Sequence, residues 1–243
     1  MLALLFATPA YCNGQVAEVP ELTQTEKMKI MEIIESLDYT LYQELVAVDP
    51  MGVEHIQADK ERGAAVMPSI EDGLPIFAVS ARALKLPARE LRFILAHELG
   101  HYVLRHYIQD FEYNVCHRAL TKQPKLPGKL SFEDAFHYAY DRTVEDEADR
   151  FAIIEFRINV DDAIALAERW RLEVQEDELR NPEKKTFQRG HPLWATRIQH
   201  LNALRGEVEL RRAKNLLPTP INWKALAKEN LEFCQKWAEA NLP

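Results

Sequence analysis

The chain has 243 residues, enough for one sizeable hydrophobic core, and its 13 prolines and 8 glycines leave few positions for a break between domains. The formal net charge of −8, without lysine and arginine clusters interleaved with aromatic residues, excludes nucleic acid and an anionic membrane surface as expected partners. The cysteines Cys12, Cys116 and Cys234 form no C-x-x-C pair, which indicates neither a zinc cluster nor a disulfide framework. We expect a single domain over residues 21–243, preceded by an extension.

The N-terminal residues Met1 to Ala10 form an apolar run of the size found in signal peptides, too short to span a bilayer. A polar stretch from Asn13 to Glu21 follows it, although the basic residues that usually precede a signal are missing. The pattern predicts a signal peptide and extension over residues 1–20, and with it a periplasmic or secreted location. The alternative is a buried N-terminal segment in a cytoplasmic protein. No integral membrane segment is expected.

A capping box, Thr23-Gln-Thr-Glu26, opens a run with apolar residues at three- and four-residue steps. It predicts a long amphipathic helix that ends near Asp49-Pro-Met-Gly52. The pattern then changes to short extended runs separated by turn residues, which predict three strands at Val53–Gln57, Ala64–Met67 and Leu74–Ser80. We expect these strands to form a small sheet ahead of the next helix.

The next predicted helix includes the stretch Leu91 to Leu104, in which His97, Glu98 and His101 interrupt an otherwise almost wholly apolar run. Buried imidazole and carboxylate groups cost several kcal/mol unless a partner satisfies them. At about 3.6 residues per turn, the two histidines lie one turn apart on one face and can reach one metal ion, with Glu98 beside them. This is the H-E-x-x-H arrangement of zinc peptidases, although a core helix with two hydrogen-bonded histidines is the alternative.

Pro87 and Gly100 indicate where this helix begins and how it packs. Pro87 suits its first turn, because the missing amide proton is not needed there. Gly100 destabilises a helix interior by about 0.5–1 kcal/mol relative to alanine, which predicts close packing against the sheet or against a second ligand helix.

A catalytic zinc keeps three protein ligands, so a third must come from elsewhere in the chain. The acidic stretch Val144 to Ala152 is a predicted helix that places Glu145 and Asp149 one turn apart. Glu145 can bind the metal, and Asp149 can accept a hydrogen bond from a ligand histidine and fix its tautomer. Glu147 is the rival ligand, but it lies on a side of the helix that looks solvated, so we favour Glu145.

Further helices are predicted toward the C-terminus. Their approximate bounds are Ser131 to Phe156, Asp161 to Val174, His191 to Leu204, and Trp223 to Ala240. Three more histidines, His106, His117 and His137, lack the spacing to His97 and His101 that a further ligand needs, so we expect each to be an ordinary histidine.

Three motifs in order, His97-Glu-Leu-Gly-His101, Arg142-Thr-Val-Glu-Asp-Glu-Ala-Asp149 and His191-Pro-Leu-Trp-Ala-Thr-Arg-Ile198, resemble those of a known family. It comprises the zinc peptidases that include the heat-shock protease HtpX and the type 1 CaaX prenyl protease. The resemblance covers roughly Ile76 to Leu204. Asp141 stands where that family usually has serine, and the membrane-spanning helices of its best-known members are absent, so nothing follows about membrane substrates.

The resemblance implies one Zn²⁺ per chain on His97, His101 and Glu145, with Glu98 as the general base and a polypeptide as substrate, such as an unfolded or misfolded protein. It also marks His191 as a donor to the developing oxyanion, a role that Tyr140 could equally fill. In the resembled family, a strand just ahead of the active helix lies along the substrate, and Ile76-Phe-Ala-Val79 occupies that position. It is either an edge strand to which a peptide can add or an ordinary sheet strand.

The sequence therefore predicts a mostly helical α+β, zincin-like zinc endopeptidase of the Glu-ligand type, with a small sheet ahead of the active-site helix. Two alternatives stay open. The chain also resembles the regulatory proteases ImmA and IrrE, which pair H-E-x-x-H with a similar acidic motif. A non-catalytic, zinc-stabilised interaction module is the other, but structural zinc sites usually have four protein ligands and three are found here.

Overall fold

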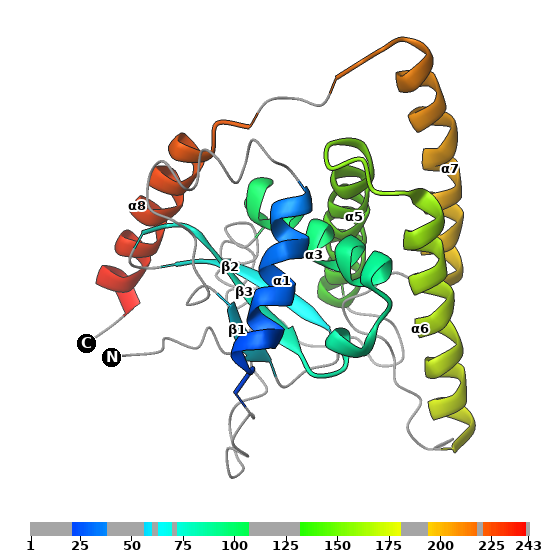
Figure 1. Cartoon of the computed structure of the whole chain (residues 1–243), viewed down its shortest axis with the longest axis horizontal. Helices are drawn as coiled ribbons and strands as arrows, with labels where there is room; N and C mark the ends of the chain where they lie inside the picture. The colour runs from blue at the N-terminus through cyan, green and yellow to red at the C-terminus, as the bar shows by residue number, and fades with distance from the viewer. Residues whose placement is uncertain are drawn as a thin grey trace.

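The computed structural model describes residues 21–37, 56–59, 63–69, 72–106, 132–180, 194–217 and 221–241. Helices dominate these residues, and one small sheet accompanies them (Figure 1), so the mostly helical α+β class is confirmed. In chain order the elements are α1 Gln24–Leu37, β1 Ile56–Asp59, β2 Ala64–Pro68, β3 Pro75–Ser80, the short 3-10 helix η2 Ala83–Lys85, α3 Ala88–Val103, α5 Phe132–Ile154, α6 Val160–Arg180, α7 Trp194–Ala213 and α8 Trp223–Asn241. The predicted signal at residues 1–20 lies outside the described residues and stays a prediction.

The three strands form one mixed sheet in the order β1-β3-β2, with β3 parallel to β1 and antiparallel to β2. The residues Phe77, Ala78 and Val79 have partners on both neighbouring strands. The prediction that Ile76-Phe-Ala-Val79 lies along the substrate as an edge strand is therefore wrong, because its backbone hydrogen bonds are already used within the sheet. A strand in the middle of a sheet cannot accept an added peptide.

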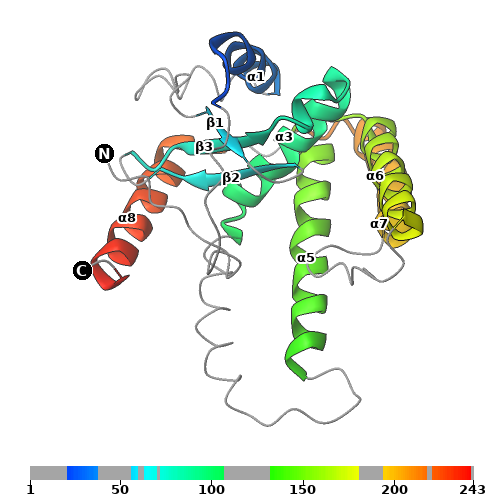
Figure 2. The ribbon, with the colours of Figure 1, turned by 90° about the horizontal axis from the view of Figure 1, so that it is seen from below.

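Helix α1 begins at the predicted capping box. The Thr23 amide donates to Glu26 Oε2 at 2.8 Å, and the Glu26 amide donates back to Thr23 Oγ1 at 3.3 Å. The described helix ends at Leu37, and the rest of the longer helix predicted from the sequence lies outside the described residues. Its buried face packs against α3, and α1 and α5 lie on opposite sides of the sheet (Figure 2). The buried residues of α1 are Ile30, Met31, Ile34 and Leu37.

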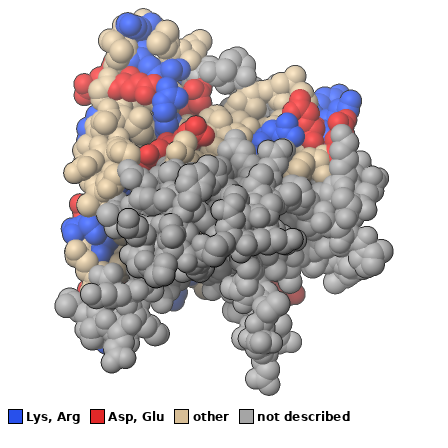
Figure 3. Space-filling view, turned by 180° about the vertical axis from the view of Figure 1, so that it is seen from behind, with Lys and Arg blue, Asp and Glu red and all other residues tan. Residues whose placement is uncertain are grey.

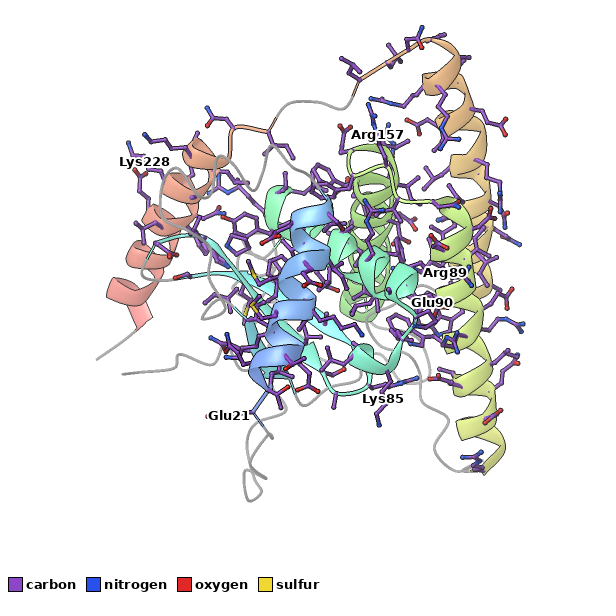
Figure 4. The ribbon with its side chains drawn as sticks, viewed as in Figure 1. Glu21, Lys85, Arg89, Glu90, Arg157 and Lys228 are labelled. Carbon is purple, nitrogen blue, oxygen red and sulfur yellow. The ribbon has the colours of Figure 1, made fainter. Side chains whose placement is uncertain are left out.

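Helix α3 is the centre of the packing and contacts the sheet, α1, α5 and α6. Its first turn is tied to α6, because the buried Glu90 accepts two hydrogen bonds from Arg169 at 2.8 and 2.9 Å. Figure 4 labels Glu90 and Arg89 where α3 begins, on the side that faces α6. Helices α6 and α7 run side by side at one end of the molecule, and α8 lies at the other (Figure 1).

Gly100 allows α3 and α5 to approach closely. A Cβ atom added at Gly100 would lie 3.2 Å from the backbone oxygen of Ala148 and 3.4 Å from the Cβ of Phe151. Of the two neighbours that the sequence allowed for this glycine, the structure shows the helix that carries Glu145, α5. The contact sets the distance at which side chains of α3 and α5 meet.

We therefore expect Gly100→Val to destabilise the protein by roughly 1–3 kcal/mol, because the added methyl groups meet α5 backbone that cannot move without repacking. The measurement is the free energy of unfolding in denaturant. Gly206→Val is the matched control, since Gly206 lies in the exposed part of α7 with nothing within 4 Å of an added Cβ. That control should change the free energy of unfolding by only roughly a few tenths of a kcal/mol, because valine and glycine differ little in helix propensity. Equal effects of both changes would show that the α3–α5 contact is not tight.

The surface of the described residues carries both signs of charge. On the face shown in Figure 3, basic and acidic side chains lie close to one another and do not gather by sign. Within the described part of the chain, none of the helices is both long enough and apolar enough to cross a lipid bilayer.

Candidate metal centre

Helices α3 and α5 bring three potential metal ligands to one point. His97 and His101 lie one turn apart on α3, and their Nε2 atoms are 3.0 Å from each other. From α5, Glu145 Oε2 lies 3.3 Å from His97 Nε2, and Glu145 Oε1 lies 3.5 Å from His101 Nε2. One ligand atom from each of the three residues lies within 4.8 Å of the others. The structure thus brings together the three residues that the sequence predicts as ligands.

The chemistry of this group fits zinc. Two imidazole nitrogens and a carboxylate oxygen are the donors that three-ligand zinc sites use. The other ring nitrogen of each histidine already has a partner: His97 Nδ1 lies 2.8 Å from Asp149, and His101 Nδ1 lies 2.8 Å from His106. Both Nε2 lone pairs are therefore directed at the shared point beside Glu145.

The charges around that point also favour a cation. Glu98, Glu145 and Asp149 contribute three carboxylates near His97, whereas Arg197 contributes one positive charge. A divalent cation would balance the net negative charge of these four groups. Burial acts to lower the pKa of His97, but Glu145 and the hydrogen bonds to Asp149 and Glu145 outweigh it and raise that pKa to about 10. The surrounding groups therefore stabilise positive charge at this position.

Asp149 contacts His97, as the sequence predicts. Its Oδ1 lies 2.8 Å from His97 Nδ1, and its side chain is buried. Burial acts to raise the pKa of Asp149, but the charge of Arg197 and the hydrogen bond from His97 lower it, so the group is a carboxylate. A carboxylate that accepts the Nδ1 proton leaves the Nε2 lone pair free for a metal.

Arg197 is a site residue whose role the sequence reasoning missed. Its Nε and Nη2 donate to the two carboxylate oxygens of Asp149 at 2.8 and 2.7 Å, and its Nη1 lies 3.4 Å from Glu145 Oε2. The guanidinium carbon also lies 5.5 Å from the centre of the Trp194 ring. The available signal was the segment His191-Pro-Leu-Trp-Ala-Thr-Arg-Ile198, in which Arg197 matches the arginine of the resembled family's third motif.

Glu98 and Glu147 differ from Glu145 in position. Glu98 Oε1 lies 4.0 Å from His97 Nε2, whereas Glu145 Oε2 lies 3.3 Å from the same nitrogen. The Glu147 side chain is 53% exposed and contacts His106, which agrees with its assignment to a solvated side of α5. The structure thus groups Glu145, and not Glu147, with the two histidines.

His106 is the second residue that the sequence reasoning missed. It follows α3 directly, is 2% exposed, and places its Nδ1 2.8 Å from His101 Nδ1. Burial and the neighbouring His101 and His97 lower the pKa of His106 to about 4, so the ring is neutral. Its spacing to His97 and His101 along the chain does not indicate which side chains support a ligand, so the contact with His101 could not be predicted.

Several predicted residues cannot be placed. His191, His117 and the loop before α5 lie outside the described residues, as do the side chains of Tyr140, Asp141 and His137. The expected roles of His191 and Tyr140 as oxyanion donors therefore stay predictions.

Comparison with protein families gives a match to the model for peptidase family M48 over residues 75–205. Searches of curated proteins and of solved structures gave no match. The matched segment begins at β3, includes α3 and α5, and ends within α7, so it contains the ligand group and Glu98. Because the match covers more than half of the chain, the protein belongs to peptidase family M48, a family of zinc metallopeptidases.

Proposed function

We propose that the protein is a zinc-dependent endopeptidase in which His97, His101 and Glu145 hold the metal and Glu98 is the general base. The observation that carries the proposal is the convergence of two imidazole nitrogens and one carboxylate oxygen from α3 and α5, with ligand atoms within 4.8 Å of one another. Membership of family M48 supports it and implies a polypeptide substrate. That membership also favours this assignment over the resemblance to ImmA and IrrE.

The bound zinc would supply a Lewis acid that lowers the pKa of a water molecule and polarises the scissile carbonyl. Glu98 would accept the proton that the attacking water loses and pass it to the departing amine. Its carboxylate is suitably placed, because it lies next to the ligand point at 4.0 Å from His97 Nε2 and its side chain is 19% exposed. Asp149 and Arg197 would keep the His97 ring in the orientation that this chemistry needs.

The sheet ahead of α3 and the H-E-x-x-H helix support a zincin-like classification, which is part of the proposal. Unfolded or misfolded proteins are the proposed substrates, because an extended chain can enter a site that a folded protein cannot. A periplasmic or secreted location is proposed from the predicted signal alone.

The test is incubation of the purified zinc-loaded protein with a mixture of unfolded proteins, followed by sequencing of the new N-termini. The proposal expects internal cleavage that stops when the metal is chelated and resumes when zinc is returned. The Glu98→Gln protein, prepared in parallel, controls for a contaminating protease. Cleavage that continues unchanged with that variant, or in chelator, would contradict the proposal.

His191 carries a separate prediction. If it donates a hydrogen bond to the developing oxyanion, His191→Ala should lower kcat by roughly 10²-fold or more while KM and zinc content change little, because the lost interaction forms only in the transition state. The measurement is steady-state cleavage of a fluorogenic peptide together with zinc analysis. A lower melting temperature with normal kcat would show instead that His191 only packs at the start of a helix.

A further inference from the structure

The chain reverses immediately after α3 and returns a third histidine to the ligand pair. The Leu104 amide donates to Gly100 O at 2.9 Å, and the Arg105 amide donates to Tyr102 O at 3.2 Å. Arg105 has φ of 59°, a left-handed conformation that residues other than glycine rarely adopt. This turn brings the His106 ring to a centroid distance of 4.9 Å from the His101 ring.

Other contacts hold this turn in place. The Arg105 side chain donates to Glu229 of α8 at 3.1 Å, and His106 is 2% exposed. A conformation that costs of order 1–3 kcal/mol persists only where the surrounding structure fixes it, and such conformations cluster at functional sites. The position of His106 is therefore fixed by the contacts of this turn with the surrounding structure.

The hydrogen bonds around His106 have a single consistent direction. A histidine that gives its Nε2 lone pair to a metal carries its proton on Nδ1, so His101 donates from Nδ1 to the Nδ1 atom of His106 at 2.8 Å. The His106 proton must then be on Nε2, where it can donate to Glu147 Oε2 at 3.1 Å. The carboxylate at the end accepts only, so the direction of the whole series is fixed.

The two ligand histidines are thus supported in different ways. His97 donates directly to a carboxylate, Asp149, which Arg197 holds. His101 donates to a neutral imidazole, and the carboxylate lies one residue farther on. The acidic segment of α5 supplies all three carboxylates: Glu145 to the metal, Asp149 to His97, and Glu147 to His106.

We infer that His106, held by Glu147, is a positioning residue that fixes the tautomer and the ring orientation of His101. This inference rests on the proposed metal site. His106 does not bind the metal in this arrangement, and its effect passes through His101. Outer partners of metal-bound histidines typically contribute roughly 10–100-fold to metal affinity.

The experiment compares zinc dissociation constants, measured by competition with a chromophoric chelator, for the wild type, His106→Phe, Glu147→Ala and Glu147→Gln. Phenylalanine keeps the ring volume but accepts no hydrogen bond, so His106→Phe should weaken zinc binding roughly 10–100-fold. Glu147→Ala should weaken binding by a smaller factor, and Glu147→Gln, whose amide oxygen still accepts, should restore most of the loss. Asp149→Asn provides the reference for loss of a direct carboxylate partner.

His200→Phe is a control for the same substitution at a histidine outside the metal centre. His200 Nδ1 lies 2.7 Å from Asp146 Oδ2, so it is also a histidine paired with an α5 carboxylate, but Asp146 is not one of the three clustered ligands. Zinc affinity should stay at the wild-type value in this variant. The visible spectrum of the Co²⁺-loaded proteins gives a second readout, because it reports ligand geometry and not fold stability. We expect it to change in His106→Phe and to remain unchanged in His200→Phe.

If His106→Phe does not fold, the tautomer of the wild-type ring tests the inference directly. Long-range ¹H–¹⁵N spectra of the zinc-loaded protein should show His106 protonated on Nε2 only, and protonation on Nδ1 would overturn the inference. Wild-type zinc affinity and cobalt spectrum in His106→Phe would overturn it as well, while leaving the proposed function intact. A wild type that binds zinc but cleaves no protein would contradict the proposed function and leave this inference standing.

Discussion

Glu98→Gln should keep zinc, fold and peptide affinity and lose turnover by about 10²–10⁴-fold or more, because glutamine has nearly the same size but cannot accept the proton from the attacking water. Glu98 lies beside the ligand point without being one of its three ligands, so the metal should remain bound. The measurements are zinc content, melting temperature, peptide KM and kcat for the wild type and the variant side by side.

The same change distinguishes catalysis from a purely structural zinc site. If Glu98 only satisfied buried neighbours, the substitution would alter the melting temperature and not the rate. Equal cleavage by both proteins would remove Glu98 as the base. Absence of cleavage by both proteins across varied substrates would favour the zinc-stabilised interaction module.

Sequence patterns located most elements that have strong local signals. The capping box placed the start of α1 to within one residue, and turn residues separated the runs that became β2 and β3. Helix α6 is longer than predicted, because the apolar periodicity ends near Val174 while the helix continues to Arg180. That last part carries the surface ion pair of Arg180 with Glu176, a pattern that supports a helix without an apolar face.

The ligand group was predictable because its spacing is local. Two histidines four residues apart share one helix face, and Glu145 and Asp149 share another, so each half of the site follows from helix geometry alone. Predicting the complete group then required only that α3 packs against α5, and Gly100 indicated such close packing.

Asp149 was predicted as a supporting residue, but Arg197 and His106 were not, since their roles depend on side chains that meet across the fold. Arg197 reaches Asp149 from α7, 48 positions along the chain, and His106 reaches His101 only because Arg105 turns the backbone into a left-handed conformation. The order of the strands could not be predicted from the sequence either, because the apolar pattern of β3 is compatible with a central or an edge position. Sequence patterns predict which residues share one face of a helix or strand, whereas contacts between residues far apart in the sequence are seen only in the structure.

The second large expected effect is on zinc affinity and concerns Glu145, the proposed third ligand. Glu145→Ala should lower zinc affinity by more than the roughly 10–100-fold expected for loss of an outer partner, because it removes a ligand oxygen and one of the carboxylates that balance the ion. Cleavage should fall with it. Glu147→Gln is the comparison variant, since Glu147 lies on the same helix two residues away, is 53% exposed and is outside the group of three, and the glutamine oxygen still accepts the hydrogen bond from His106.

Thermal and chemical unfolding with and without zinc make this prediction quantitative. Zinc at about 100 times the wild-type Kd should stabilise the wild type by about 2.7 kcal/mol, whereas a variant that binds 100-fold more weakly should gain only about 0.4 kcal/mol. The increase in the free energy of unfolding on addition of zinc should therefore be nearly absent for Glu145→Ala and close to the wild-type value for Glu147→Gln. The zinc-free proteins serve as the baseline, so a general loss of stability cannot be mistaken for loss of a ligand. The opposite ranking of the two variants would mean that the wrong face of α5 has been assigned to the metal.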